Sequence, residues 1–173
     1  SLAGAVNSTS LRIAGDEMDE AISSHLRRHH NLHIGELSAE KVKLTIGSAW
    51  PMEQELSYEV KGRDSVTGLP RRTTVTSIEI REALEHPVRL ICEAIRGQLE
   101  LAPPEISADL VESGLTLVGG GSLLLGMPEC IEDYLGVPAR VADDPLTAVA
   151  RGTGIFLDKL DVFSKVLATE EDL

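Results

Sequence analysis

The sequence contains few aromatic side chains, few cysteines and no long uninterrupted apolar run. Phe, Trp and Tyr make up only 3% of the 173 residues, so a core must be built mainly from Leu, Ile, Val and Ala. Cys92 and Cys130 lie far apart in the sequence, in predicted helices. We interpret both as reduced thiols of a cytosolic protein rather than as a disulfide framework. We expect neither a membrane span nor a signal peptide.

Positive charge is also scarce. The 16 Lys and Arg residues stand against 28 Asp and Glu residues, and the formal net charge is -12. This balance argues against a nucleic-acid backbone or an anionic membrane as the main partner. The hydrophobic content of 42% suits a soluble globular protein of one large domain or two small ones. Because the chain opens at Ser1 with strand-like sequence, we expect the C-terminal part of a longer protein, or a cleaved or engineered fragment.

The first half of the chain predicts strands, two helices and a hairpin. Leu2–Ala14 is strand-like, and Asp16 is a candidate N-cap for the helix that follows. Ser38 is a candidate N-cap for a second helix over residues 39–47. Leu56–Thr76 is typical of strands that surround a turn rich in Gly, Asp and Pro.

The second half predicts a long helix and then alternating strands and helices. Thr76 and Glu79 form a capping box before the longest helical pattern, in which Pro87 should cause a kink or a break. A short helix, a strand, three glycines, a helix through Tyr134, a strand over Val137–Ala142 and a last helix follow. This order indicates an α/β protein with a subdomain inserted near residues 33–85.

The glycine triplet lies in the segment LTLVGGGSLLLGM, Leu115–Met127. Glycine loses much conformational freedom on folding, so the triplet needs either a very tight turn or a ligand close to the backbone. The segment is not a phosphate loop, because no Gly-Lys-Ser/Thr follows. It is not the dinucleotide fingerprint either, since Leu124 stands where that motif needs glycine. On this motif alone, a close crossing of strand and helix is the favoured explanation.

Two further motifs allow a plain and a functional interpretation. Gly152 and Gly154 lie in a predicted helix, where helix–helix contact is favoured over ligand contact. Glu40 and Lys43 are three residues apart and could form a surface ion pair. Alternatively, the glutamate accepts hydrogen bonds from sugar hydroxyls while the lysine stem lies along a base.

A metal site is disfavoured. His25, His29 and His33 recur every fourth residue and could share a helix face, but two arginines stand among them and no carboxylate completes a four-ligand set. No Ser-His-Asp or Cys-His arrangement has local support, so the sequence by itself predicts no catalytic residue.

Several long segments together resemble one family. SLRIAGDEMDEAI, NLHIGELSAEKVKLTIGSA, EVKGRDSVTGLPR, LAPPEISADLVESGLTLVGGGSLLLGM and VADDPLTAVARGTG are similar, in this order, to the C-terminal half of the bacterial actin homologue MreB. The resemblance covers nearly all of residues 1–160. It implies domain II of an actin-like ATPase, a ribonuclease-H-like core with an inserted α+β subdomain. Residues 1–32 and 86–168 would form subdomain IIA, its first strand missing, residues 33–85 subdomain IIB, and residues 169–173 a disordered tail.

The resemblance also implies an ATP site and the residues that contact adenosine. Glu40 and Lys43 would hold ribose and adenine. The glycine turn would contact the nucleoside through Gly119, Gly120, Gly121, Ser122, Leu123 and Leu124. With this resemblance, a bound nucleoside becomes the favoured explanation of the three glycines, in place of a close crossing of strand and helix. The helix with Gly152 and Gly154 resembles the family's second connection between the two halves.

The family's phosphate loops and Mg²⁺ ligands belong to its other half. The resemblance therefore implies that the parent protein is an ATPase coupled to polymerisation and that this chain alone is inactive. It implies a cytoplasmic protein that forms homopolymeric filaments, determines cell shape and guides cell-wall synthesis, with membrane contact through the other half. The implied partners are the cell-wall elongation machinery and a RodZ-like cytoplasmic domain.

Two alternatives remain. In the first, the chain is a partner-docking interaction module that does not bind nucleotide on its own. In the second, a remote one, it belongs to a sugar kinase or chaperone of the same superfamily, which would need substrate-binding insertions or a peptide-binding domain.

Overall fold

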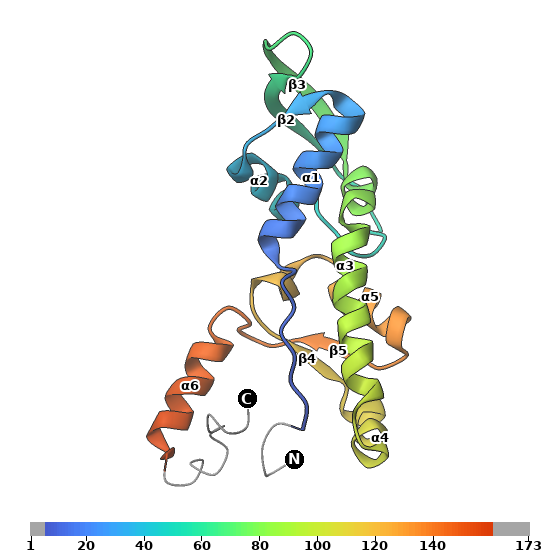
Figure 1. The fold of residues 1–173 in the computed structure, drawn as a ribbon, viewed down its shortest axis with the longest axis vertical. Coiled ribbons are helices and arrows are strands. Elements are labelled where there is room, and N and C mark those ends of the chain that lie inside the picture. The colour runs from blue at the N-terminus through green and yellow to red at the C-terminus, as the bar shows by residue number, and fades with distance from the viewer. Residues whose placement is uncertain (1–5, 161–173) are drawn as a thin grey trace.

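The computed structural model describes residues 6–160 as an elongated body along which two helices run side by side (Figure 1). These are α1, Gly15–His30, and α3, Ser77–Glu100. Apolar side chains from both helices and from the elements around them form one continuous buried core. The predicted tail at 169–173 lies outside the described residues. No helix within residues 6–160 is long and apolar enough to cross a membrane.

One end of the body is a small antiparallel sheet with two helices beside it. Strands β1 (Leu32–His33), β2 (Ser57–Asp64) and β3 (Pro70–Thr76) pair in the order β1-β2-β3. Helices α1 and α2 (Glu36–Ile46) pack on one another, and α2 also contacts β2. The predicted hairpin is confirmed, although its turn is shorter than the sequence suggested. The Asp64 carboxylate accepts hydrogen bonds from two backbone N–H groups of this turn and so holds it.

The helix α3 is one uninterrupted element, so of the predicted kink or break at Pro87 the break is wrong. Proline removes a backbone hydrogen bond from a helix, but this one is buried against the core. Burial of its ring offsets the missing bond. The predicted start is confirmed: the Thr76 hydroxyl accepts from the Glu79 backbone N–H at 3.3 Å. Ile80 and Leu84 of the predicted apolar stripe are fully buried, whereas Ile91 is only partly buried.

The other end of the body alternates helices and short strands, as expected. The elements are α4 (Pro104–Ser113), β4 (Leu115–Leu117), the 3-10 helix η1 (Gly120–Leu123), α5 (Met127–Leu135), β5 (Ala139–Val141) and α6 (Ala148–Asp158). Within the described residues, β4 and β5 form a two-stranded parallel sheet. The predicted helix through Tyr134 is split into η1 and α5, because Leu124 is extended and Gly126 has φ +73.

Three local predictions at the start of the chain are corrected. Residues 6–14 form no strand, and the rest of the predicted strand Leu2–Ala14 lies outside the described residues. Asp16 is not the N-cap of α1: it lies in the first turn, and Ala14 precedes the helix. Ser38 is not the N-cap of α2: the helix begins at Glu36 after Gly35, and the Ser38 N–H already donates to the Gly35 carbonyl within the first turn.

Candidate functional site

The glycine turn joins β4 to η1. Gly119 has φ +81, a left-handed conformation that a side chain disfavours, so this glycine is needed for the turn itself. The carbonyl oxygen of Gly119 accepts a hydrogen bond from the Ser122 hydroxyl at 2.7 Å. The backbone N–H of Gly119 donates to the Pro145 carbonyl at 2.7 Å, which ties the turn to the segment before α6. Ser122 is therefore a residue that shapes the turn.

Gly120 and Gly121 are not explained by internal packing. Neither has positive φ, and both are exposed. A Cβ placed on Gly121 would meet no atom within 4 Å, and one on Gly120 would meet only a Leu146 methyl group at 3.8 Å. The close strand–helix crossing favoured on the motif alone is therefore wrong for these two positions within the described residues. Their backbone is open to a partner from outside this part of the chain.

The two leucines after the turn differ in exposure. Leu123 is 50% exposed, whereas Leu124 is 8% exposed and belongs to the buried core. Of this pair, only the Leu123 side chain is available to a ligand at the surface.

The lysine of the second predicted motif lies against the start of α1. Lys43, in the last turn of α2, places its Nζ 2.9 Å from Asp19 Oδ2 and donates to the Gly15 carbonyl oxygen at 3.0 Å. The pair is nearly buried, with side-chain exposures of 12% for Lys43 and 7% for Asp19. Glu40 is exposed and makes no ion pair within the described residues, so the expected pair with Lys43 is wrong. Helical spacing gave no sign of Asp19 or Gly15 as partners.

Gly15 connects the lysine to the glycine turn. Its carbonyl oxygen holds Lys43, and Gly15 lines one cavity together with Gly121 and Ser122. A Cβ on Gly15 would lie 3.1 Å from Lys43 Nζ, so glycine permits this close approach. Gly15, at the start of α1, thus contacts Lys43 and lines the same cavity as the glycine turn.

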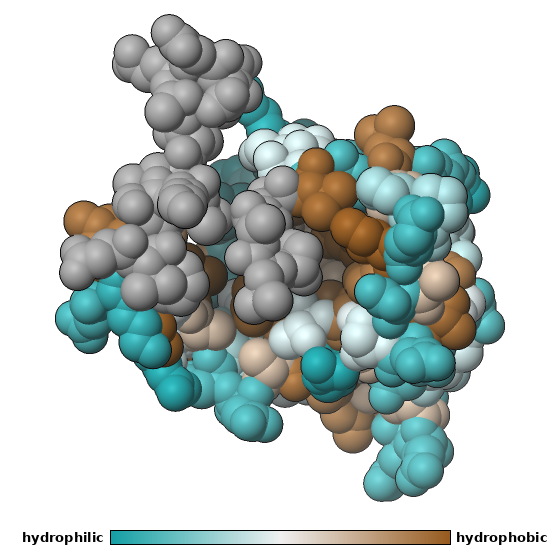
Figure 2. Space-filling view, turned by 90° about the horizontal axis from the view of Figure 1, so that it is seen from below, coloured by the Kyte–Doolittle hydropathy of each residue, from teal (hydrophilic) through white to brown (hydrophobic). Residues whose placement is uncertain are grey.

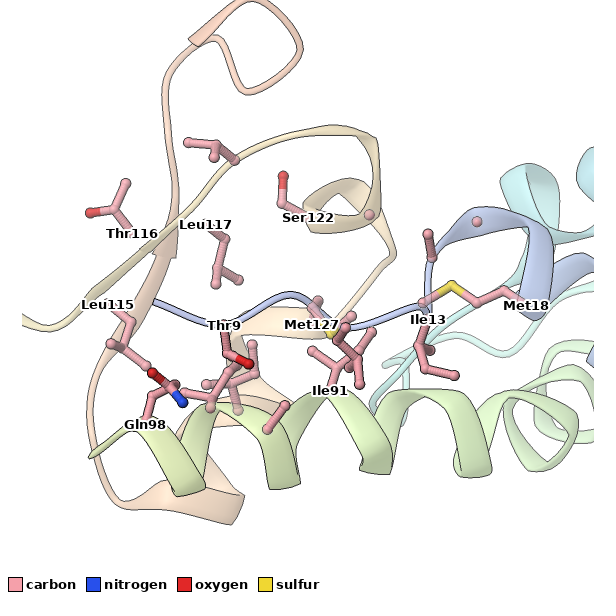
Figure 3. Close-up of a pocket in the computed structure, with 18 of the residues that line it drawn as sticks. Thr9, Ile13, Met18, Ile91, Gln98, Leu115, Thr116, Leu117, Ser122 and Met127 are labelled. Atoms are coloured by element: carbon pink, nitrogen blue, oxygen red, sulfur yellow. The ribbon is translucent and has the colours of Figure 1, made fainter. Parts of the chain in front are cut away.

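The shared cavity has a volume of about 550 Å³ and an apolar lining (Figure 3). Ile91 and Gln98 of α3 face Leu115 and Leu117 of β4 across it, and the extended segment that carries Thr9 runs between them. Among residues 6–160, no charged side chain lines it. Seen from the end of the molecule that carries α4 and α6, apolar surface surrounds a hollow (Figure 2). The cavity suits an apolar group and offers no counter-ion to a phosphate.

A second hollow lies next to α1 and is acidic. Four of its lining side chains are carboxylates, and it also includes Ser23; the carboxylates belong to Asp16, Asp19, Glu20 and Glu36. Carboxylates accept hydrogen bonds from hydroxyl groups and repel anions. This side of α1 is therefore chemically suited to a sugar and not to a phosphate chain.

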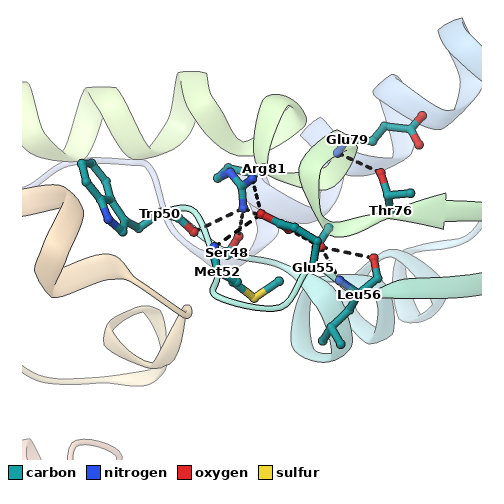
Figure 4. A network of polar contacts seen from close by, with 9 residues as sticks. Ser48, Trp50, Met52, Glu55, Leu56, Thr76, Glu79 and Arg81 are labelled. Atoms are coloured by element: carbon teal, nitrogen blue, oxygen red, sulfur yellow. Dashed lines mark hydrogen bonds and ion pairs between the residues drawn. The ribbon is translucent and has the colours of Figure 1, made fainter.

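A polar network fastens the segment between α2 and β2 to α3 (Figure 4). The Arg81 guanidinium donates to Glu55 Oε1 at 2.7 Å, to the Ser48 hydroxyl at 3.0 Å and to the Trp50 carbonyl at 3.3 Å. Hydrogen bonds from Arg81 and then from Ser77 lower the pKa of Glu55 to about 2. Sequence reasoning missed this network, because its members are far apart along the chain.

The same segment meets the chain just after the glycine turn. Ser48 and Leu125 form a parallel bridge, and the Ala49 N–H donates to the Leu125 carbonyl at 2.7 Å. A Cβ on Gly126 would lie 2.4 Å from Trp50 Cβ, so Gly126 is required by close packing. Residues 48–49 therefore connect the part of the molecule that carries Lys43 to the chain just after the glycine turn, and Arg81 anchors this segment to α3.

The last helix, α6, has no buried residue within the described chain. A Cβ on Gly152 or Gly154 would meet nothing within 4 Å. The predicted helix–helix contact at these glycines is therefore wrong within the described residues. Val149 and Ile155 are 66% and 53% exposed, so α6 presents apolar surface to solvent.

The profile of the family described as MreB/Mbl protein matches residues 1–165. The chain belongs to the MreB/Mbl family. The cell shape-determining protein MreB of Escherichia coli K12 is 44% identical over 171 residues, which are 99% of this chain and 49% of that protein. The cell shape-determining protein Mbl of Bacillus subtilis 168 is 40% identical over 165 residues, 95% of this chain and 50% of that protein. The chain thus spans about half the length of the MreB and Mbl relatives it matches.

Solved structures of the MreB/Mbl family share the fold. MreB5 of Spiroplasma citri bound to AMPPNP superposes with a TM-score of 0.86 at 35% identity, over 90% of this chain and 47% of that one. The same protein bound to ADP gives a TM-score of 0.87 over 92% of this chain and 48% of that one. The MamK double helical filament superposes with a TM-score of 0.75 at 24% identity, and this similarity shows the fold alone. The architecture is therefore a mixed α/β actin-like fold.

Proposed function

We propose that this chain is domain II of an MreB-type filament protein and supplies the adenosine-contacting wall of its ATP cleft. Residues 1–32 and 86–168 would form subdomain IIA with a ribonuclease-H-like core, and residues 33–85 subdomain IIB. Family membership and coverage of about half of each relative support this division. The long helix α3 would connect the subdomains, since it begins beside the small sheet and ends beside α4 (Figure 1).

The observation that carries the proposal is the open backbone at Gly120 and Gly121. Neither glycine has positive φ or a close neighbour, and Gly121 also lines the 550 Å³ cavity, so a flat ligand can lie against their backbone. The Lys43 ammonium is held by Asp19 and by Gly15, which lines the same cavity as Gly121. The 12% of the lysine side chain that stays exposed would contact the base, while the exposed Glu40 carboxylate accepts from ribose hydroxyls.

Phosphate fits the two hollows near the start of α1 poorly. Within the described part of the chain, no cation lines the apolar cavity, and the other hollow is acidic. Among residues 6–160 no group of three His, Cys, Asp or Glu side chains could hold a metal ion. We therefore assign to the described residues the nucleoside and not the phosphates. Phosphoryl transfer depends on metal and charge clamps, so the chain alone is expected to be inactive, whereas the whole protein would be an ATPase coupled to polymerisation.

The wider role follows from the relatives. Proteins named for cell-shape determination are 40–44% identical to this chain, and two MreB5 structures hold AMPPNP or ADP. We extend these properties to the whole protein: a cytoplasmic, membrane-associated homopolymer that guides cell-wall synthesis. A RodZ-like cytoplasmic domain and the cell-wall elongation machinery would be its partners.

The test compares two glycine-to-valine variants of the full chain. Gly121→Val projects a side chain from the proposed contact surface, and Gly97→Val is the matched control, because a Cβ at Gly97 also meets nothing within 4 Å. Binding of adenosine and ADP is measured by calorimetry, with urea melts to confirm folding. We expect Gly121→Val to lose at least about tenfold in affinity, equivalent to about 1.4 kcal/mol, with stability unchanged. Equal affinity of both variants would refute the proposed contact.

The interaction-module alternative is favoured by one observation, the exposed apolar surface of α6. A helix with Val149 and Ile155 exposed needs a covering partner. Separate titrations of the chain with ATP and with a RodZ-like cytoplasmic domain decide between the functions. Binding of the protein partner without any nucleotide binding would support the module and contradict the adenosine wall.

A further inference from the structure

The only two cysteines of the chain lie side by side in the structure. Cys92 is in α3 and Cys130 in α5, two helices that pack on one another. Both thiols line one cavity of about 390 Å³, whose wall also includes Trp50, Arg89 and Tyr134. The sequence had suggested two reduced thiols rather than a disulfide framework. The fold makes them a dithiol at the edge of a solvent-connected pocket.

The two thiols have unequal surroundings. Cys92 is 1% exposed, and Cys130 is half-buried. The hydrogen bond from Cys92 lowers the pKa of Cys130 to about 7, although burial and Asp133 oppose this. The same hydrogen bond, together with burial, raises the pKa of Cys92 strongly. At neutral pH, Cys130 is thus partly a thiolate beside a protonated Cys92, and the thiolate is the reactive form of cysteine.

We propose that Cys92 and Cys130 form an oxidation site at which a peroxide that enters the 390 Å³ pocket produces an intramolecular disulfide between α3 and α5. The Cys130 sulfur attacks one peroxide oxygen, the O–O bond breaks and hydroxide leaves, so that Cys130 becomes a sulfenic acid. The Cys92 sulfur then attacks the Cys130 sulfur as its S–O bond breaks. The proton of Cys92 leaves with that oxygen as water. Two thiols lose two electrons in total, and one peroxide is reduced to two waters.

The position of the disulfide gives it a structural consequence. The helix α5 begins at Met127, directly after the glycine turn, and Cys130 lies in its first half. A covalent link to α3 would close the loop of chain between the two cysteines and restrict the unfolded state. We therefore expect the oxidised chain to melt at a higher temperature than the reduced chain. This inference does not depend on nucleotide binding, so its test is independent of the test of the proposed function.

The test treats the folded full chain with a few equivalents of hydrogen peroxide and follows intact mass and peptide maps. The expected product is a monomer that has lost two hydrogen atoms, with a peptide cross-link between Cys92 and Cys130 that dithiothreitol reverses. Its melting temperature should rise by several degrees. Cys92→Ser should stop at a Cys130 sulfenic acid that dimedone traps, whereas Cys130→Ser should leave Cys92 unmodified, because Cys92 is buried.

Three results would overturn the proposal. One is a disulfide that forms only in the urea-unfolded chain. Another is wild-type chain in which Cys130 proceeds to sulfinic acid or to intermolecular dimers while Cys92 stays free. The third is a folded chain that remains reduced under conditions that fully oxidise a small-molecule dithiol.

Discussion

Replacement of Lys43 by alanine is expected to destabilise the chain strongly. Lys43 Nζ lies 2.9 Å from Asp19 Oδ2, and the side chains are only 12% and 7% exposed. The other Asp19 oxygen, Oδ1, is buried without a hydrogen-bond partner within the described residues. Without the lysine, a buried carboxylate would therefore have no counter-ion and no compensating donor.

The expected loss is about 3–5 kcal/mol of unfolding free energy, the cost of removing one partner from a buried ion pair. That figure includes the hydrogen bond to the Gly15 carbonyl oxygen, worth about 1 kcal/mol. Since domains of this kind are stable by about 5–15 kcal/mol, the change would be a large fraction of the total. Removing both charges in an Asp19→Leu/Lys43→Met double variant should restore stability to within about 1 kcal/mol of the wild type, because a buried pair replaced by apolar residues is often neutral.

The assay is urea denaturation at pH 7, followed by circular dichroism. Arg72→Ala is the matched control, because Arg72 forms an exposed pair with Glu59 at side-chain exposures of 66% and 51%. That variant should change the free energy of unfolding by at most about 1 kcal/mol. A loss below about 1 kcal/mol in Lys43→Ala would refute the reasoning, since Asp19 would then be solvated once the lysine is gone.

Three further predictions concern pH, packing and turnover. Arg81 and Ser77 hold the pKa of Glu55 at about 2, below the ordinary 4.5, so ionised Glu55 stabilises the fold at neutral pH and this contribution is lost as pH falls from about 4.5 toward 2. Glu55→Gln should therefore make the free energy of unfolding, measured by urea melts, less dependent on pH in that range. An equal fall of this free energy in the wild type and the variant would contradict the prediction. Leu84→Ala should cost about 2–5 kcal/mol because Leu84 is fully buried. By contrast, Ala94→Leu should not lower the melting temperature, because Ala94 lines the 550 Å³ cavity. A phosphate-release assay on the chain alone should give no turnover above blank, and measurable turnover would assign phosphate-handling residues to this half.

Local signals in the sequence predicted most of the secondary structure. The turn residues between β2 and β3 and the N-cap at Thr76 depend on neighbours in sequence, and both predictions are confirmed. Of the predicted capping box, only the bond from the Glu79 N–H to Thr76 forms, because the Glu79 carboxylate contacts His25 and His30 instead. The errors arose where tertiary packing decides the outcome. Burial lets Pro87 stay inside α3, and the left-handed backbone of Gly126 interrupts the predicted helix after the glycine turn.

The candidate site could be predicted only in part. The glycine turn and the Glu40–Lys43 spacing are visible in the sequence, but Lys43 pairs with Asp19, 24 residues away, which no helical period reveals. The contact between Cys92 and Cys130 is equally invisible, because it depends on how α3 and α5 pack. The sequence also cannot tell whether a glycine is needed for close packing or for a ligand. The space around a Cβ placed on that glycine decides this, and only the structure gives that space. That space separates Gly126, which is enclosed, from Gly121, which is open.

The central claim is that one nucleoside contacts both the glycine turn and Lys43. The most direct measurement is a titration of the isotopically labelled full chain with adenosine, followed through its backbone amide resonances. The amides of Gly120, Gly121 and Ser122 should shift together with that of Lys43, and all four should give the same dissociation constant. Saturable shifts that spare the glycine turn, or that leave Lys43 unchanged, would contradict the claim.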